Sequence, residues 1–349
     1  MRPLRNLVAE EVTNRFLTQH PDWLVRYGDR ARMFGIEDAG YHQDFLTAAI
    51  ESGQVDAFRD YAGWAAGMLM ARHMDPCLLA ENLQQIGYAL RRQLLGSDAG
   101  IVDVFIQAGV ARSLDYRVDA SPSPSGRLAQ LTALYVDAAI GGNRQAALNL
   151  MLEAVKQGHF VVDLYIEALQ PAMYRIGKLW EETSITVATE HMATAITQYV
   201  IARLYPLIEL APGSRGKIVV TGVEGEFHQI GANMIADVLE ASGWDVRFLG
   251  TNTPFAGVLD AVEEHQAEIL GISATVLSNV PNVVRLVESV RAKAGRPIRI
   301  LVGGSAFRSA PLLYREIGAD GCGFDLRSAL ALVNGAPSKE SETGSGGPL

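Results

Sequence analysis

Apolar residues recur at helical spacing through the first third of the chain. The candidate helices cover residues 6–18, 41–51, 56–72, 76–90 and 101–114. Within each of them hydrophobic positions lie three or four residues apart, as one buried face of a helix requires. Pro76 stands in a first turn, where proline is favoured. No strand-like alternation separates these segments, so residues 1–118 predict an all-helical module.

A second helical block follows a segment that breaks helices. Residues 119–126 contain prolines, serines and a glycine, a composition typical of a linker. The helices expected beyond it cover residues 128–140, 143–156, 161–180 and 187–208. Their short connections favour an antiparallel four-helix bundle across residues 127–210. Pro171 should kink or restart the third helix, because its nitrogen has no hydrogen to donate.

Beyond a boundary at residues 211–216, short apolar runs alternate with helical patterns. The predicted strands cover residues 217–222, 245–250, 268–275, 299–303 and 321–323. The predicted helices cover residues 230–241, 254–265, 280–294, 311–317 and 326–334. This alternation predicts a flavodoxin-like α/β domain across residues 216–335, with a five-stranded parallel sheet. The polar tail of residues 336–349 is expected to be disordered.

The composition is that of an ordinary folded protein. Of the 349 residues, 48% are hydrophobic and 20% are charged, which suits two or three domains. The net charge of −9, with only the small basic pair Arg91 and Arg92, argues against direct nucleic-acid binding. Cys77 and Cys322 match no metal or redox spacing. No apolar run reaches membrane-spanning length and no secretory signal pattern is found, so a cytoplasmic protein without a membrane partner is expected.

Candidate chemistry appears where the first predicted strand ends. His228 lies there, two residues after Glu226 and three before Gly231. Open parallel sheets bind ligands at this edge. A carboxylate on one imidazole nitrogen would leave the other nitrogen facing outward as a metal ligand. Taken alone, a histidine in such a loop is usually a solvated side chain, and the motif is a weak pattern.

Later strands end in residues that would meet the histidine loop at the same edge. Ser273 and Thr275 would supply hydroxyls inside a slot between strands. Gly303 and Gly304, with Gly231, would let the backbone approach a bulky group closely, since no Cβ intrudes. Taken separately, Ser273 is also an ordinary strand-end residue, and the glycine pair an ordinary strand terminator.

The joint order of these motifs resembles the cobalamin-binding domain family. It reads Glu226-x-His228-x-x-Gly231, then Ser273-x-Thr275, then Gly303-Gly304. The resemblance implies that the histidine replaces the cofactor's own benzimidazole below cobalt, while the displaced nucleotide tail enters the slot lined by the serine and the glycines. Two residues depart from the family pattern, Glu in place of its usual Asp and Thr in place of its usual Leu.

The helical bundle carries a second resemblance. Trp180 is followed, after nine residues, by Glu190 and His191. This spacing is similar to the helical cap of light-sensing cobalamin regulators, in which these residues shape the pocket for the adenosyl group. A tryptophan ending a bundle helix is otherwise a core residue, and a Glu-His pair a surface feature. Residue 181 is Glu where some regulators carry a histidine that captures cobalt after light, so His191 or water is left for that role.

The first module lacks the basic recognition helix with which those regulators read DNA. The order of helical module, cap and cobalamin domain resembles the photocobilins, which pair cobalamin with biliverdin. Aromatic and arginine side chains would stack on a linear tetrapyrrole and pair with its propionates, and their alternative is an ordinary helix surface and core. The candidate bilin-binding residues are Tyr61, Trp64, Arg72, His73, Tyr88, Arg91 and Arg92. Cys77 offers covalent attachment, or, at a helix start, a small buried hydrophobic side chain.

The sequence therefore predicts a light sensor rather than an enzyme. Adenosylcobalamin would bind with His228 below cobalt and the Trp180 cap above. Light would break the cobalt–carbon bond, shift the cap and alter a homo-oligomer interface, with biliverdin as second chromophore. Two alternatives stay open: a corrinoid methyl carrier of a methyltransferase system, and a haem- or bilin-only sensor.

Overall fold

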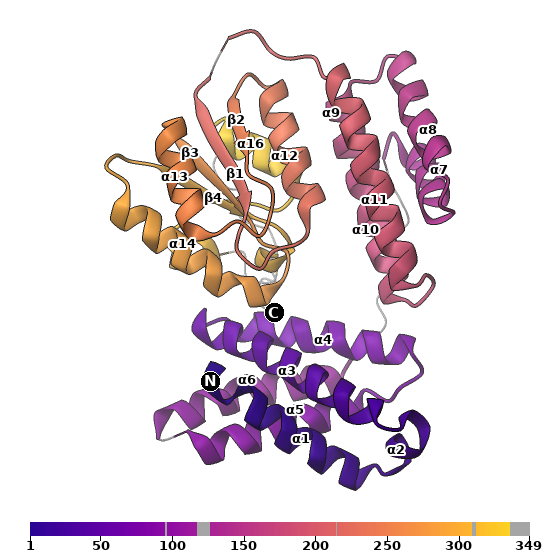
Figure 1. The fold of residues 1–349 in the computed structure, drawn as a ribbon, viewed down its shortest axis with the longest axis vertical. Coiled ribbons are helices and arrows are strands. Elements are labelled where there is room, and N and C mark those ends of the chain that lie inside the picture. The colour runs from indigo at the N-terminus through magenta and orange to yellow at the C-terminus, as the bar shows by residue number, and fades with distance from the viewer. Residues whose placement is uncertain (95, 117–125, 214, 309–311, 336–349) are drawn as a thin grey trace, which may run out of the picture. The chain divides into compact units, whose positions relative to one another are not determined.

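The computed structural model describes residues 1–94, 96–116, 126–213, 215–308 and 312–335. The chain forms two compact units, Met1–Asp119 and Ala120–Leu349 (Figure 1). The predicted linker, apart from Gly126, and the predicted disordered tail lie outside the described residues. In the part of the chain that is described, no helix is both long and apolar enough to cross a membrane.

The first unit is all helical, as predicted. Its α-helices are α1 (Arg5–Gln19), α2 (Asp22–Tyr27), α3 (Arg30–Glu51), α4 (Val55–Ala71), α5 (Cys77–Gln93) and α6 (Ser97–Leu114). Helix α6 packs on α4 and α5, and α1 packs on α3 and α5. The core is built from fully buried side chains such as Leu46, Phe58, Leu83, Ile86 and Leu90.

The prediction for helix α3 was wrong at its start, since the helix begins eleven residues before Tyr41. The missed turns carry no apolar stripe, and Met33 and Phe34 are exposed. They pack through small residues instead. A Cβ on Gly35 would lie 2.7 Å from Thr13 Cγ2 of α1, so the two backbones approach closely. Close packing at a glycine leaves no periodic pattern of hydrophobic residues from which a helix could be predicted.

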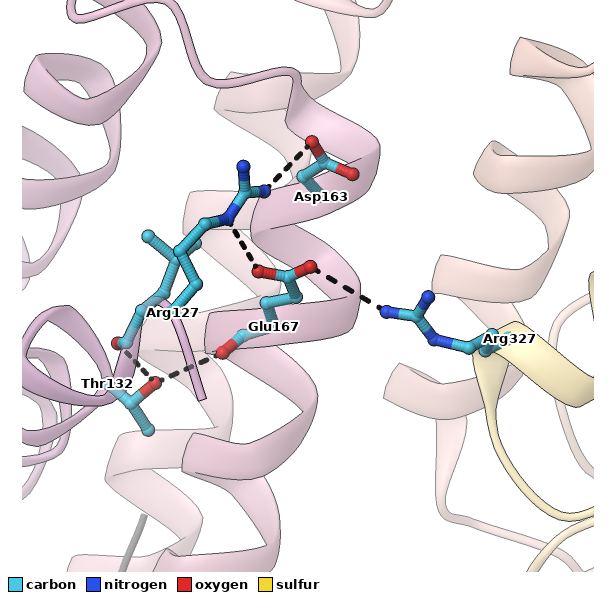
Figure 2. A network of polar contacts seen from close by, with 6 residues as sticks. Arg127, Thr132, Asp163, Glu167 and Arg327 are labelled. Carbon is cyan, nitrogen blue, oxygen red and sulfur yellow. Dashed lines mark hydrogen bonds and ion pairs between the residues drawn. The ribbon is translucent and has the colours of Figure 1, made fainter. Parts of the chain in front are cut away.

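The second unit starts with the predicted helical bundle. Its elements are α7 (Ala129–Ile140), α8 (Arg144–Lys156), α9 (Val161–Leu164), the π-helical turn Tyr165–Leu169, α10 (Gln170–Glu181), α11 (Val187–Leu204) and the 3₁₀ turn Tyr205–Leu207. The third predicted helix therefore changes register just before Pro171, as the missing N–H leads one to expect. The Thr132 hydroxyl of α7 donates to the carbonyl of Glu167, four residues before Pro171, at 3.3 Å (Figure 2).

The α/β domain follows. Its strands are β1 (Lys217–Gly222), β2 (Asp245–Phe248), β3 (Ile269–Ser273), β4 (Arg299–Gly303) and β5 (Gly321–Gly323). Its α-helices are α12 (Gln229–Ala241), α13 (Phe255–His265), α14 (Val280–Lys293), α15 (Leu313–Glu316) and α16 (Leu326–Val333). The strands pair in parallel in the order β2-β1-β3-β4-β5, which is the flavodoxin-like order. The predicted strands at 245–250 and 268–275 were each two or three residues too long.

The bundle and the α/β domain share one hydrophobic core. Ile230, Met234 and Val238 of α12, with Leu326 of α16, pack into the cluster formed by the bundle helices. In Figure 1, α12 and α16 lie on the bundle side of the sheet and α13 and α14 on the other. Because the five strands are parallel, their carboxyl ends lie at one edge of the sheet, where the candidate residues were expected.

Polar contacts supplement this apolar interface. Glu167 accepts from Arg127 Nε at 3.1 Å and approaches Arg327 of α16 at 3.7 Å (Figure 2). Both arginines are largely exposed, so these ion pairs contribute little to stability. Inside the interface, the Tyr165 hydroxyl of the π turn donates to Asp237 of α12 at 3.0 Å. This contact is buried and belongs to the core.

Candidate functional site

The histidine loop begins where β1 ends. Residues 223–226 form a tight turn closed by a hydrogen bond from the Glu226 N–H to the Val223 carbonyl, 2.9 Å. His228 then occupies the N-cap position of α12 with extended backbone angles. Strand, turn and helix start thus place the His228 side chain at the carboxyl edge of the sheet, and 60% of that side chain is exposed.

Glu226 is completely buried beneath this loop. One carboxylate oxygen accepts from His228 Nδ1 at 2.5 Å and from the His228 N–H at 2.8 Å. The other accepts from the Thr275 N–H at 2.5 Å and from Asn279 Nδ2 at 3.2 Å. Four donors converge on one carboxylate, as an ionised buried group requires.

The electrostatics agree with that geometry. Burial by itself would raise the pKa of Glu226, but hydrogen bonds from His228 and from the Thr275 N–H outweigh it and lower the pKa. The hydrogen bond to Glu226 raises the pKa of His228 against the opposing effect of burial, and the charges of Glu226 and Glu190 raise it further. Since Nδ1 is committed to the carboxylate, a neutral His228 directs the lone pair of Nε2 outward.

Of the two residues predicted to supply hydroxyls, Thr275 also makes backbone contacts, and its hydroxyl as a cofactor contact stays a prediction. Thr275 serves the histidine loop through its backbone N–H, and its carbonyl accepts from Ser305 Oγ at 2.9 Å. Ser273 lies at the end of β3, in register with Gly222 of β1 and Gly303 of β4. Its hydroxyl as a cofactor contact stays a prediction.

The three candidate glycines fall into two kinds. A Cβ on Gly231 would meet nothing within 4 Å, so this glycine opens onto free space beside the histidine. A Cβ on Gly303 would lie 2.7 Å from the Gly323 carbonyl oxygen. Gly304 has φ +104, and its Cβ would lie 2.2 Å from the Ala274 carbonyl oxygen. The sheet itself therefore requires Gly303 and Gly304, whatever they contribute to a ligand site.

The cap residues lie at the end of the bundle that carries the α10–α11 connection. Trp180 is half-buried near the end of α10. Glu190, in the first turn of α11, accepts from His191 Nδ1 at 2.6 Å and from Thr194 Oγ1 at 2.9 Å. The Glu190 charge also raises the pKa of His228. The exposed His191 and Trp180 as contacts above a cofactor stay predictions.

The predicted bilin residues belong to separate groups of the first unit. The Tyr61 ring stacks on Phe45 with ring centroids 3.8 Å apart and lies 6.0 Å from the Trp64 ring. Its hydroxyl forms a hydrogen bond of 2.6 Å with His42 Nδ1. These contacts form one aromatic cluster around Tyr61 on α3 and α4.

A second group lies on α5. The Tyr88 ring lies beneath Arg15 and Arg92, Arg92 pairs with Glu11, and Arg91 pairs with Asp103. At the end of α4, Arg72 donates to the Met68 carbonyl, and His73 follows with φ +56. The prediction that Cys77 is buried was wrong, since this cysteine is exposed at the start of α5.

Three asparagines around the histidine loop escaped prediction. Asn279 contacts Glu226, Asn252 Oδ1 accepts from the Gly225 N–H at 2.9 Å, and Asn282 Nδ2 donates to the Glu224 carbonyl at 2.6 Å. Each follows a strand at the same sheet edge, after β2 or β3. That position was the one available signal, and asparagine in a loop is too common to single out.

These residues fit a corrinoid. The tetrapyrrole brings four nitrogen ligands of its own and needs one axial ligand, and His228 offers a single outward nitrogen fixed by a buried carboxylate. No group of three or more His, Cys, Asp or Glu side chains in the described part of the chain could hold a bare metal ion. Gly231, three residues after His228, faces open space in which a bulky group could lie.

Comparisons with known proteins agree with this fit. Residues 216–332 match a family described as B12 binding domain, and residues 131–205 match a second family with the same description. A corrinoid protein of Desulfitobacterium hafniense is 30% identical over 202 residues, 56% of this chain and 93% of the relative. Dimethylamine corrinoid protein 1 of Methanosarcina acetivorans is 26% identical over 157 residues, 44% of this chain and 73% of the relative.

A solved structure shares the fold of the second unit. The monomethylamine corrinoid protein of Methanosarcina barkeri superposes with a TM-score of 0.53 at 21% identity, covering 59% of this chain and 98% of its own. The two matched families both lie in the second unit, so the first unit is outside them. From its sequence, its fold and its histidine loop, the chain belongs to the family of cobalamin-binding corrinoid proteins.

Proposed function

We propose that this chain is the corrinoid carrier subunit of a methyl-transferring system. One observation carries the proposal: the buried Glu226 fixes Nδ1 of His228, so that Nε2 is presented at the open sheet edge. His228 would hold cobalt from below, and Gly231 would leave room for the corrin ring. The bound cofactor would supply a cobalt centre that accepts and donates a methyl group.

The protein's own contribution is the control of the axial ligand. The carboxylate of Glu226 keeps the imidazole in one orientation and increases its basicity. Protonation of Glu226 or His228 would weaken the hold on cobalt, so proton uptake at this pair accompanies loss of the ligand. The similarity to relatives named as dimethylamine corrinoid proteins supports a corrinoid carrier.

The carrier proposal is tested with methyl iodide and a thiol. The chain is loaded with hydroxocobalamin, reduced, supplied with methyl iodide and then with a thiol acceptor. We expect methyl uptake and release at rates that differ from free cobalamin and return toward them in His228→Ala. Rates equal to those of free cobalamin, in both the wild type and the variant, would refute a carrier with a controlled ligand.

A second candidate function is the light sensor predicted from the sequence. The observation that favours it is the helical unit Met1–Asp119, which lies outside both matched domains and contains the aromatic cluster around Tyr61. In this candidate adenosylcobalamin binds under the Trp180 cap, and biliverdin binds in the first unit. Absorption spectra in the dark and after green light, repeated with biliverdin, test it. A spectrum unchanged by light and by biliverdin excludes this candidate.

A further inference from the structure

The turn that precedes the candidate cobalt ligand is held from outside by side chains of two other segments. Its outward N–H, that of Gly225, donates to Asn252 Oδ1 in the loop between β2 and α13. Its outward carbonyl, that of Glu224, accepts from Asn282 Nδ2 in the first turns of α14. Neither polar group takes part in the pairing of the sheet strands.

The segment around Asn252 is itself fixed to β1. The Gly222 N–H donates to the Gly250 carbonyl at 2.8 Å, and the Thr221 hydroxyl donates to Thr253 Oγ1 at 3.0 Å. Asn252 has φ +55, a left-handed conformation that asparagine tolerates better than most residues. The loop thus carries a residue suited to this backbone, with its amide oxygen on the turn.

The turn can occupy its position because residue 225 is glycine. Gly225 has φ +88, and a Cβ there would lie 3.1 Å from Asn279 Oδ1. The Asn282 side chain is also oriented, since its Oδ1 accepts from Arg285 one helical turn along α14. Both asparagines are therefore held on the protein before they hold the turn.

We propose that Asn252 and Asn282 are positioning residues for the cobalt ligand. They hold the 223–226 turn, so that Glu226 and His228 stand in their ligating arrangement before a corrinoid binds. Because the loop is already ordered, binding of a corrinoid loses less conformational entropy. The affinity therefore increases without any new contact. This inference rests on the proposed corrinoid function and adds residues that do not themselves supply the axial ligand.

Two variants remove the contacts while sparing the backbone. Asn252→Gly keeps a residue that accepts positive φ and deletes the amide oxygen. Asn282→Asp keeps the acceptor for Arg285 and replaces the donor to the Glu224 carbonyl with a second acceptor. The matched controls are Gln266→Gly, which relieves the same left-handed conformation at the end of α13, and Glu288→Gln on the exposed face of α14.

The first readout is amide hydrogen exchange of the full chain without cofactor. We expect the Gly225 amide to exchange about tenfold faster in Asn252→Gly, the factor that corresponds to one lost hydrogen bond. Gln266→Gly should exchange there like the wild type. Equal protection of Gly225 in the wild type and in Asn252→Gly would overturn the proposal.

The second readout is electron paramagnetic resonance of bound cob(II)alamin with ¹⁵N-labelled histidine. We expect the double variant to bind about tenfold more weakly and to show a smaller histidine-ligated fraction than the paired control. Full ligation at wild-type affinity would overturn the proposal. A wild type that binds no cobalamin would refute the corrinoid function instead, and the exchange data would still decide whether the asparagines hold the turn.

Discussion

Glu226 links the candidate ligand His228 to two further residues of the α/β domain, one after β3 and one at the start of α14. Its carboxylate contacts His228 in the histidine loop, the Thr275 N–H after β3 and Asn279 at the start of α14. A glutamate at this position reaches these donors while remaining fully buried. The departure from the usual Asp therefore retains the contact with the histidine.

Replacing Glu226 with Gln tests this arrangement at the residue scale. The amide removes the charge that raises the pKa of His228 and turns one acceptor toward the Thr275 N–H into a donor. We expect the pKa of His228 to fall, and the free energy of unfolding to fall by about 1–3 kcal/mol, the cost of an unsatisfied buried group. Proton NMR titration of the His228 ring in the cofactor-free chain measures the pKa, and urea unfolding the stability.

The sign of the pH dependence follows from both shifts. Because the pKa of Glu226 is lowered in the folded chain, its contribution to the free energy of unfolding is lost as pH falls through that pKa. Because the pKa of His228 is raised in the folded chain, the stabilisation from its charged pair with Glu226 is lost as pH rises through the pKa of His228. Glu226→Gln should abolish both changes. A His228 titration that is the same in the variant and in the wild type would refute the ion pair.

The residues of the loop could be predicted from the sequence, whereas their partners could not. Glu226 and His228 are two residues apart, so local spacing alone brings them into contact. Asn279 and Thr275 reach Glu226 from about fifty residues away, through the pairing of β1 with β3. The contact of the Thr275 backbone N–H with Glu226 leaves no trace in residue type, so the sequence could not show it.

At the scale of elements, the strands of the α/β domain were predicted well because each is a buried apolar run between turn residues. Strands β1, β4 and β5 have the predicted bounds. The candidate glycines Gly231 and Gly304 serve two different purposes, which the sequence does not separate. Gly304 permits a close approach of β4 to the segment after β3, while Gly231 leaves space at the start of α12.

Paired alanine variants distinguish these purposes. Gly304→Ala should destabilise the fold by more than about 3 kcal/mol, because φ +104 and a 2.2 Å approach to the Ala274 carbonyl cannot both be relieved. Gly231→Ala should leave the cofactor-free chain equally stable or stabilise it by up to about 1 kcal/mol, yet weaken corrinoid binding. Thermal unfolding and cobalamin titration measure the two effects. Wild-type stability of Gly304→Ala would contradict the first, and wild-type affinity of Gly231→Ala the second.

At the scale of the whole molecule, the bundle and the α/β domain meet through a buried acid. Asp237 of α12 accepts from the Tyr165 hydroxyl, which also donates to the Ile201 carbonyl at 3.3 Å. Burial raises the pKa of Asp237 to about 6 from an ordinary value of 3.8. The folded chain thus holds this proton more tightly than the unfolded chain does.

Asp237→Asn should therefore gain stability relative to the wild type as pH rises. Between about pH 4 and pH 6 the unfolded wild type loses the proton while the folded wild type keeps it, so its stability falls by about 3 kcal/mol. The asparagine carbonyl still accepts from Tyr165 and does not titrate. Urea unfolding at pH 4 and pH 7 checks this, with Glu288→Gln on the exposed face of α14 as control. A constant difference between Asp237→Asn and the wild type would show that Asp237 has an ordinary pKa.

The division into units was accessible from composition, but the role of the first unit was not. Helices α1, α3, α4, α5 and α6 were found from their apolar spacing and α2 was missed, while a linker was placed at the boundary between Asp119 and Ala120. Tyr61 lies in an aromatic cluster and Tyr88 lies beneath two arginines, and the binding of a bilin by these residues stays a prediction. Sequence spacing along different helices does not determine which side chains meet, because that depends on helix packing.

The most direct test of the account is the identity of the nitrogen below cobalt. Electron paramagnetic resonance of the full chain loaded with cob(II)alamin resolves splitting by an axial nitrogen. We predict a three-line pattern with natural histidine that becomes a two-line pattern with ¹⁵N-histidine, and that disappears in His228→Ala. A three-line pattern that persists with labelled histidine would mean that the cofactor keeps its own benzimidazole, and the histidine-loop account would be wrong.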